Sequence, residues 1–488
     1  MAPPLCQVFY ARLVILFRLY CSSIVLMIQI FNTLTGIKEP LKKTSRPIRL
    51  FVCGPTVYDS PHIGNARTYV AFDIIVRSLR TLGYTIVYLQ NITDIDDKII
   101  QRAQQTKTSW RTLARSYERE YHQNEYDLGI ISVDVYARAT DHIPHIVAQV
   151  QALLKKGYAY AIADDGYYFD IARFKDYGKL SGRTALQAED AVTRVDDSVA
   201  KRNKGDFALW KFAKPGEPSW KTALGSGRPG WHIEDTAITE TYFGTQYDIH
   251  GGALDLKFPH HEAEIAQQEA ASGKSPLVRL WMHTGFLLMQ GEKMSKSKGN
   301  FLSINDFLTS YPAPVFRYIV LSHHYRAPLD YTNTTASQAH AALASIQLFV
   351  WKLHTITQKG MLSKTIKDIV ALARNHYHQA IEDDFNTPLA LAALFELIGT
   401  TEKILETLSA RDATYIASYI TDTFRTLGIS LSARPTIPAA ITRLNTQREA
   451  HRRYKQFMQA DALRNEMDTL GYIVEDTPHG PFLYPKSH

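Results

Sequence analysis

Apolar residues recur along this chain with two different periods. Runs of consecutive apolar residues over 48–53 and 85–91 flank a longer stretch, 64–82, in which apolar positions have helical spacing up to Gly83. Consecutive apolar residues are typical of strands buried on both faces, whereas recurrence every three to four residues is typical of helices. A strand, a helix and a strand in this order predict a βαβ unit and therefore an α/β fold with a parallel sheet.

The same patterns divide the first two thirds of the chain further. Helical spacing predicts amphipathic helices over 109–127 and 141–156, and apolar runs predict further buried strands around 248–256 and 280–290. The region 160–230 is rich in Gly, Pro, Lys and Asp and has little periodicity. We therefore expect it to be an insertion between two halves of the sheet domain.

The last third has mainly helical periodicity. Short helices are expected over 301–330, and apolar stripes with a spacing near 3.6 residues predict several helices between 335 and 430. A basic helix is expected from Arg448 to Leu470.

Composition narrows the class of protein. A chain of 488 residues is longer than one compact hydrophobic core usually accommodates, so two to four domains are expected. The net charge of +7 and the pI near 9.0 favour a polyanionic partner. Three cysteines, Cys6, Cys21 and Cys53, argue against a disulfide framework and favour a reducing compartment.

The first 37 residues are apolar, contain no acidic residue and carry only Arg12 and Arg18 as charges. Polar residues from Ser22 onward leave less than the roughly 20 apolar residues that a spanning helix needs. We expect the true start at Met27 and no membrane association. A transit peptide is the alternative, and a membrane anchor is the weakest interpretation.

Two short motifs carry chemistry that suits a nucleotide. The sequence Pro-His-Ile-Gly-Asn at 61–65 follows the first predicted strand and opens the first predicted helix. His62 and Asn65 are three residues apart, so both side chains can face one phosphate chain, while Gly64 lets the backbone approach closely. Further on, 293–297 reads Lys-Met-Ser-Lys-Ser, a basic loop whose lysines Lys293 and Lys296 can neutralise departing phosphates.

A second constellation suits a metal ion. Cys53 ends the first predicted strand, and His260 and Glu264 lie four apart on one face of a later helical run. A thiolate, an imidazole and a carboxylate from separate segments are ligands that zinc takes.

Both motifs, in this order, resemble the signatures of class I aminoacyl-tRNA synthetases, and the residues around them resemble the cysteinyl-tRNA synthetase family. The resemblance runs from about Met27 to Pro478. It implies a Rossmann-like parallel-sheet catalytic domain split by an insertion, then a helical bundle and a small C-terminal anticodon-binding domain. The chain departs from the class at Asn65, where a second histidine is usual. We expect activity to survive, because an amide still donates a hydrogen bond to phosphate.

The resemblance also implies one zinc ion per chain, held by Cys53, His260 and Glu264 and bound directly to the thiolate of substrate cysteine. Such a contact separates cysteine from serine because zinc prefers a thiolate to a hydroxyl. The family's fourth ligand is a cysteine after Trp-His-Ile-Glu, whereas Asp235 stands there in this chain. Aspartate can coordinate zinc, so we assign it as a ligand to a harder site.

Further matches complete the prediction. By resemblance, Thr93 and Trp231 border the cysteine pocket, and Gly251, Gly252 and Asp255 meet adenosine. The predicted site comprises catalytic residues His62, Asn65, Lys293 and Lys296; ATP-binding residues His62, Gly64, Asn65, Gly251, Gly252, Asp255 and Lys296; cysteine-binding residues Cys53, Thr93 and Trp231; and metal ligands Cys53, Asp235, His260 and Glu264.

The resemblance divides the chain as follows: 1–26, a doubtful N-terminal extension; 27–140, the first half of the catalytic domain; 141–230, a connective insertion; 231–300, the second half with the Lys-Met-Ser-Lys-Ser loop; 301–340, a stem-contact region; 341–430, a helical tRNA-binding bundle; and 431–488, an anticodon-binding domain. In the last segment, the basic residues Arg448, Arg452, Arg453 and Lys455 could hold phosphates, and Tyr454 and Phe457 could stack on bases.

The implied reaction joins L-cysteine to the terminal adenosine of tRNA(Cys), using ATP with Mg²⁺, in a cytoplasmic monomer. Two other readings remain. One is a ligase that joins activated cysteine to an amino-sugar, which resembles only the front half of the chain. The other is a catalytically silent tRNA-binding protein, suggested only by Asn65 and Asp235.

Overall fold

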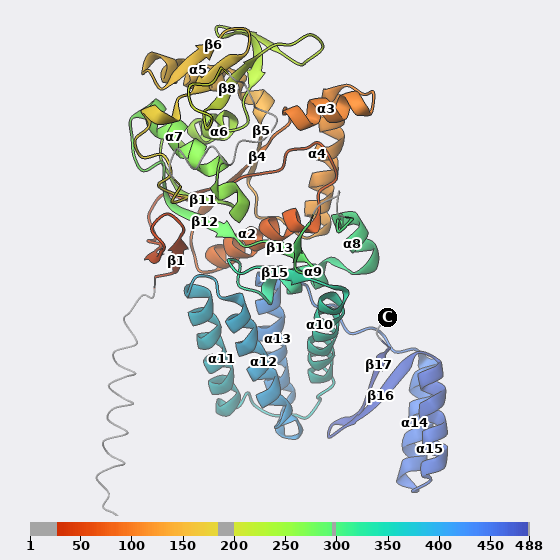
Figure 1. Cartoon of the computed structure of the whole chain (residues 1–488). Helices are drawn as coiled ribbons and strands as arrows, with labels where there is room; N and C mark the ends of the chain where they lie inside the picture. Colours follow the sequence, from red (N-terminus) through yellow and green to blue (C-terminus); the bar gives the residue numbers. More distant parts are fainter. Residues whose placement is uncertain (1–26, 184–199, 295–298, 487–488) are drawn as a thin grey trace, which may run out of the picture.

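The computed structural model describes residues 27–183, 200–294 and 299–486, and its centre is a five-stranded sheet of order β12-β11-β3-β4-β5 (Figure 1). The strands are β3 (Ile48–Val52), β4 (Ile86–Ile92), β5 (Val135–Arg138), β11 (Tyr247–Ala253) and β12 (Val278–Thr284). Every neighbouring pair is parallel, which confirms the predicted α/β class.

Helices cover both faces of this sheet. Leu50 and Val52 of β3 pack into the apolar core that contains α2 (Ile63–Thr81). The alternate residue Phe51 packs into a second core with residues of α6 (Ile233–Phe243) and α7 (His260–Ser272). Burial on both faces explains why the strands read as continuous apolar runs in the sequence.

The strand order reverses between β3 and β11, because β4 and β5 continue to one side while β12 lies on the other. In open parallel sheets a ligand crevice forms at such a point, beyond the carboxyl ends of the strands. The predicted helices occur as α2, α4 (Trp110–Asp127) and α5 (Ile143–Lys155), and a helix that was not predicted, α3 (Asp97–Gln105), precedes α4.

The predicted strand over 280–290 is two strands. β12 ends at Thr284, and β13 (Leu287–Met289) pairs instead with β14 (Glu292–Lys293) and β15 (Leu329–Tyr331). The chain leaves the main sheet at Gly285, whose N–H donates to the carbonyl of Tyr325 at 2.9 Å. A side chain at Gly285 would collide with the carbonyl oxygens of residues 326 and 327, which run alongside.

In the sequence, the segment between the two halves of the parallel sheet forms an antiparallel sheet of order β6-β7-β8-β10-β9. Its strands are β6 (Ala159–Ile162), β7 (Gly166–Phe169), β8 (Phe207–Phe212), β9 (Trp220–Thr222) and β10 (Gly225–Pro229). Helix α5, which precedes this sheet, packs against α6 and α7. A separate hairpin, β1 (Gln29–Asn32) and β2 (Ile37–Pro40), lies against β12.

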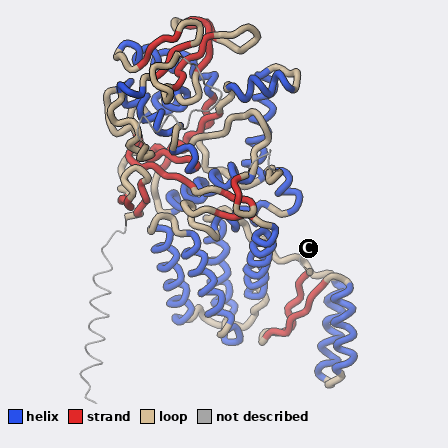
Figure 2. The backbone as a smooth tube through the Cα atoms, viewed as in Figure 1, coloured by secondary structure: helices blue, strands red, loops and turns tan. Residues whose placement is uncertain are grey.

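The following region is helical (Figure 2). It contains α8 (Ile304–Ser310), α9 (Ala313–Leu321), α10 (Asn333–Leu353), α11 (Lys364–Glu382), α12 (Thr387–Glu402) and α13 (Ala410–Thr426). A fully buried carboxylate joins this bundle to the rest: Asp384, between α11 and α12, accepts hydrogen bonds from Phe31 N–H, the Tyr325 hydroxyl and Arg326 Nε. Its φ of +59° lies in the left-handed region.

The predicted basic helix from Arg448 to Leu470 is wrong. The chain forms two helices, α14 (Ala439–Arg453) and α15 (Phe457–Thr469), because it turns at Lys455 with φ of +57°. β16 (Tyr472–Thr477) and β17 (Gly480–Pro485) follow as an antiparallel ribbon. This terminal unit stands beside the bundle and has its own small core, built from Ile441, Met467, Val474 and Leu483 (Figures 1 and 2).

Within 27–183, 200–294 and 299–486, no helix has both the length and the apolar character needed to cross a membrane. The expectations for residues 1–26, Cys6 and Cys21 lie outside the described residues.

Candidate active site

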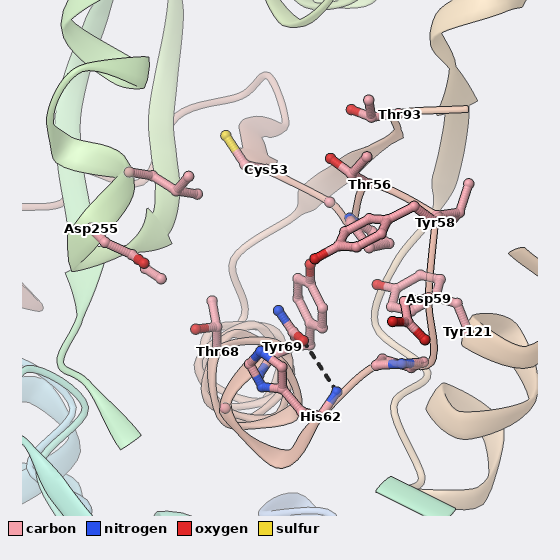
Figure 3. Close-up of a pocket in the computed structure, with 18 of the residues that line it drawn as sticks. Cys53, Thr56, Tyr58, Asp59, His62, Thr68, Tyr69, Thr93, Tyr121 and Asp255 are labelled. Atoms are coloured by element: carbon pink, nitrogen blue, oxygen red, sulfur yellow. Dashed lines mark hydrogen bonds between the residues drawn. The ribbon is translucent and has the colours of Figure 1, made fainter. Parts of the chain in front are cut away.

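A pocket of about 310 Å³ opens where the strand order reverses. Predicted site residues that line it are Cys53, His62, Gly64, Asn65, Thr93, Trp231, Asp235, Asp255, His260 and Lys293. Figure 3 shows Cys53 and Thr93 toward one end, His62 at the start of α2 toward the other, and Asp255 opposite the tyrosines Tyr58 and Tyr69. The fold therefore brings residues from both halves of the sheet domain to one cavity.

The first motif forms a reciprocal cap on α2. The ring nitrogen Nδ1 of His62 accepts from the Asn65 N–H at 3.2 Å, and Asn65 Oδ1 accepts from the His62 N–H at 3.2 Å. The cap holds both side chains at the helix N-terminus, where the backbone favours an anion. Asn65 thus has a structural role that the sequence pattern did not suggest.

The second motif reaches the same pocket. Lys293 Nζ forms an ion pair with Asp255 Oδ2 at 2.8 Å and lies 5.0 Å from the centre of the Phe286 ring. Both partners are well exposed, so this pair contributes little to stability. The predicted phosphate ligand and the predicted ribose acceptor are therefore neighbours. Lys296 lies outside the described residues.

Gly251 and Gly252 do not line the pocket, although the sequence suggested that they admit adenosine. A Cβ at Gly251 would lie 2.2 Å from the Phe72 ring, and a Cβ at Gly252 would lie 2.7 Å from the His261 ring. Close packing between β11 and its neighbouring helices therefore accounts for both glycines.

The four predicted metal ligands come together beside the pocket, and three of them, Cys53, Asp235 and His260, line it. His260 Nε2 lies 2.9 Å from Asp235 Oδ2 and 3.1 Å from Glu264 Oε1. The Cys53 thiol lies 3.6 Å from Asp235 Oδ2, and the potential ligand atoms of all four residues lie within 4.8 Å of one another. All four side chains are buried, and Asp235 Oδ1 has no hydrogen-bond partner among the residues that the structure describes. The donor types and the orphaned oxygen fit a divalent cation.

The electrostatics of the cluster favour the same interpretation. Burial raises the pKa of the Cys53 thiol well above its usual value, and the carboxylates of Glu264 and Asp235 raise it further. Burial likewise raises the pKa of Glu264 and of the neighbouring Glu234, to which Asp235 adds repulsion. Buried acidic groups without a counter-charge are costly, and a bound cation would stabilise their ionised forms.

Trp231 and Thr93 border the cluster. The Trp231 ring stacks on His260 with 4.5 Å between centroids, which fixes the imidazole from the pocket side. The Thr93 hydroxyl donates to Glu234 Oε1 and accepts from Asn91 Nδ2. Both positions agree with the predicted border of a small amino-acid pocket.

Sequence reasoning missed a group of buried histidines behind the cluster: His232, His250, His261 and His283. Burial lowers the pKa of each of them, to about 3 for His283, so their rings are neutral and able to act as ligands. The paired His260-His261 and the His-Gly-Gly segment were the available signals. Nothing in their spacing showed that β11 and α7 would bring them together.

Comparison with known proteins adds family evidence. The family described as "tRNA synthetases class I (C) catalytic domain" matches residues 40–341, and the family described as "DALR domain" matches residues 376–432. A relative named cysteine–tRNA ligase from Thermococcus onnurineus is 41% identical over 473 residues, covering 93% of this chain and 98% of the relative. One of the same name from Coxiella burnetii is 41% identical over 463 residues, with the same coverage.

Among solved structures, the methionyl-tRNA synthetase of Mycobacterium tuberculosis with methionyl-adenylate superimposes with a TM-score of 0.59. The match covers 78% of this chain and 89% of the methionyl-tRNA synthetase chain. Because the identity is only 16%, the match shows a shared fold and nothing further. The family match spans more than half of the chain, and the relatives are similar over nearly their whole length. The chain therefore belongs to the cysteinyl-tRNA synthetase family of class I aminoacyl-tRNA synthetases.

Proposed function

We propose that this enzyme activates L-cysteine with ATP and transfers it to the terminal adenosine of tRNA(Cys). A carboxylate oxygen of cysteine attacks the α-phosphorus, giving cysteinyl-adenylate and pyrophosphate. The 2′-hydroxyl of the terminal adenosine then attacks the carbonyl carbon, AMP leaves, and the hydroxyl proton is released. The observation that carries this proposal is the shared pocket, in which Cys53, Asp235 and His260 lie with His62 and Lys293.

The phosphate-binding residues act by position and charge. His62 and Asn65 donate to the phosphate chain from the first turn of α2, where the helix dipole also favours an anion. Lys293, with Lys296 of the same loop, neutralises charge on the β- and γ-phosphates, with Mg²⁺ as a further counter-ion. Lys293 must leave Asp255 to do so, and Asp255 then becomes free to accept from the ribose hydroxyls.

Zinc is the metal that suits the cluster best, held by Cys53, Asp235, His260 and Glu264. When bound, it supplies a soft Lewis acid that prefers the thiolate of cysteine to the hydroxyl of serine. A purely apolar pocket would separate these near-isosteres poorly. Trp231 covers His260 and keeps the imidazole in place, while Thr93 and Glu234 supply polar groups next to the ligand set.

The tRNA side is proposed from the rear of the chain. The match to the DALR domain covers α12 and α13, and the terminal unit presents Arg453 and Lys455 beside exposed aromatic side chains. Arg448 does not fit the phosphate-binding role, since it is buried and paired with Asp476. We also propose the domain division given above. We further propose that the enzyme is a monomer and that it acts in the cytoplasm.

The relatives match both halves of the chain, which argues against the amino-sugar ligase, and the paired motifs in one pocket argue against a silent scaffold.

The test is charging of total tRNA with labelled cysteine by protein that starts at Met27, with serine and a chelator-treated sample as controls. Cysteine-specific, chelator-sensitive charging is expected. In the same assays, the variant Trp231→Ala should lower both cysteine-dependent ATP–pyrophosphate exchange and the charging of tRNA. Exchange with cysteine but no charging of any tRNA would overturn the assignment to tRNA.

A further inference from the structure

The buried histidines behind the pocket complete a second set of metal ligands. Cys53, His250, His261 and Glu264 also have potential ligand atoms within 4.8 Å of one another. We call this the rear set, and Cys53, Asp235, His260 and Glu264 the front set. The two sets share Cys53 and Glu264, so a single ion can occupy one position or the other.

The rear imidazoles face the shared thiol. His261 Nε2 lies 3.2 Å from Cys53 Sγ, and His250 Nε2 lies 3.4 Å from the same sulfur. Both rings are fully buried, and their centroids are 4.4 Å apart.

The opposite nitrogen of each ring is already held. His250 Nδ1 lies 2.7 Å from the Tyr247 hydroxyl, and His261 Nδ1 lies 2.8 Å from His283 Nε2. His283 in turn contacts the Thr33 hydroxyl through Nδ1 at 2.9 Å. Metal-bound histidines commonly have this arrangement, in which an outer partner fixes the tautomer and the ring orientation.

The two sets differ in their access to the pocket. Asp235, His260 and Cys53 line it, whereas His250, His261 and Glu264 do not. An ion in the front position has three ligands that line the pocket, whereas an ion in the rear position has only Cys53.

They also differ in hardness. The front set offers one thiolate, one imidazole and two carboxylates, and the rear set offers one thiolate, two imidazoles and one carboxylate. Zinc favours imidazole and thiolate ligands over an additional carboxylate. Asp235, where the family pattern has cysteine, is what makes the front set the poorer one.

We propose that Cys53, His250, His261 and Glu264 form a second zinc position, occupied while the pocket holds no cysteine. The substrate thiolate draws the ion to the front position, because only there does it gain a second sulfur ligand. This inference rests on the proposed binding of zinc but not on the transfer to tRNA.

X-ray absorption at the zinc edge of the holoenzyme tests the proposal, since sulfur and imidazole ligands give distinct distances, about 2.3 and 2.0–2.1 Å. Without cysteine, one sulfur and two imidazoles are expected. With saturating cysteine, two sulfurs and one imidazole are expected. One sulfur and one imidazole in the substrate-free protein would overturn the rear position.

Two variants sharpen the result. Asp235→Cys softens the front set, so the substrate-free protein should then show two sulfurs and one imidazole. His250→Gln removes a rear ligand only, so the imidazole count should fall from two to one with sulfur unchanged. An unchanged imidazole count in both variants would also refute the proposal.

Charging of tRNA is measured on the same samples to separate the two proposals. Charging by protein whose zinc always has one imidazole leaves the enzymatic function standing and removes the rear position. Protein that charges tRNA without binding zinc overturns both the rear position and the zinc-based selection of cysteine.

Discussion

At the scale of single residues, the proposed chemistry uses side chains that each serve two purposes. Asn65 caps helix α2 and also lines the pocket. Lys293 and Asp255 neutralise each other across the pocket before any substrate arrives. Because these roles are separable, substitution at each position should change binding, catalysis and stability to different extents.

Replacement of Asn65 separates stability from phosphate binding. Asn65→Ala removes the side-chain half of the cap, so the free energy of unfolding should fall by about 1 kcal/mol. It also removes one hydrogen-bond donor, so kcat/KM for ATP in pyrophosphate exchange should fall about tenfold. Asn65→His should restore the donor and keep kcat/KM within about threefold of the parent, a factor worth well under 1.4 kcal/mol. Equal loss in both variants would contradict the donor role.

Lys293→Ala should lower kcat for pyrophosphate exchange by about 10²-fold, the usual cost of losing one preorganised charge that acts in the transition state. KM for ATP should change much less, because Lys293 is paired with Asp255 before ATP binds. The measurement is steady-state exchange at varied ATP. Lys274→Ala, an exposed lysine after α7, is the matched control, and an unaffected kcat in Lys293→Ala would refute this role.

At the scale of elements, helix α2 connects the site to the body of the protein. Its N-terminus carries His62 and Asn65, and further along Asp73 binds Arg317 of α9 at 2.6 Å, with both side chains fully buried. Asp73 also accepts from Arg77 and from Ser132. One carboxylate thus ties helix α2 to the helical region and to the loop after α4.

This carboxylate should make stability depend on pH. Burial opposes the charge of Asp73, but Arg317, Arg77 and Ser132 outweigh it and hold its pKa below the usual value. A lowered pKa in the folded state stabilises the protein above the unfolded-state value of about 3.9, and the contribution is lost as the pH falls through the folded-state value. The free energy of unfolding by urea should therefore decline below about pH 4.

Asp73→Asn should cost about 3–5 kcal/mol at pH 7, because Arg317 would stay buried without its counter-charge. The difference from the parent should shrink as the pH approaches the folded-state pKa. Asp134→Asn, which breaks a half-exposed pair with Arg80, should cost no more than about 1 kcal/mol. A similar loss of free energy of unfolding in both variants would show that the buried Asp73–Arg317 pair contributes no more to stability than the half-exposed pair does.

Sequence periodicity predicted the long helices α2, α4 and α5 to within about two residues, because each buries one face. It failed at Lys455, where a left-handed residue ends a helix without the glycine or proline that normally signals a turn. It also merged β12 with β13, since the departure at Gly285 depends on a neighbouring segment forty residues away. The front metal ligands followed from family resemblance, but the rear histidines depend on tertiary packing between β11 and α7.

At the scale of the whole molecule, the pocket lies beyond the carboxyl ends of the central strands. The terminal unit stands beside the bundle, away from the parallel sheet (Figure 1). Tyr454 and Phe457 are 79% and 59% exposed at the turn between α14 and α15, next to Arg453 and Lys455. Aromatic side chains beside exposed cations suit single-stranded nucleotides.

Tyr454→Ala with Phe457→Ala should raise KM for tRNA by about 10-fold or more, since stacking contributes roughly 1–3 kcal/mol per base. Pyrophosphate exchange without tRNA should be unchanged, because the turn lies outside the pocket. Tyr126→Ala, which removes an equally exposed tyrosine at the end of α4, is the control. An unchanged KM for tRNA in the double variant would exclude this turn from recognition.

The buried carboxylate of Asp384 has a mechanical consequence. It joins the bundle to β1 and to the segment after α9 by hydrogen bonds. Separating these parts would leave the buried carboxylate without its hydrogen-bond donors. Separation of the bundle from the catalytic domain should therefore cost free energy beyond the loss of apolar packing, and the junction should resist bending.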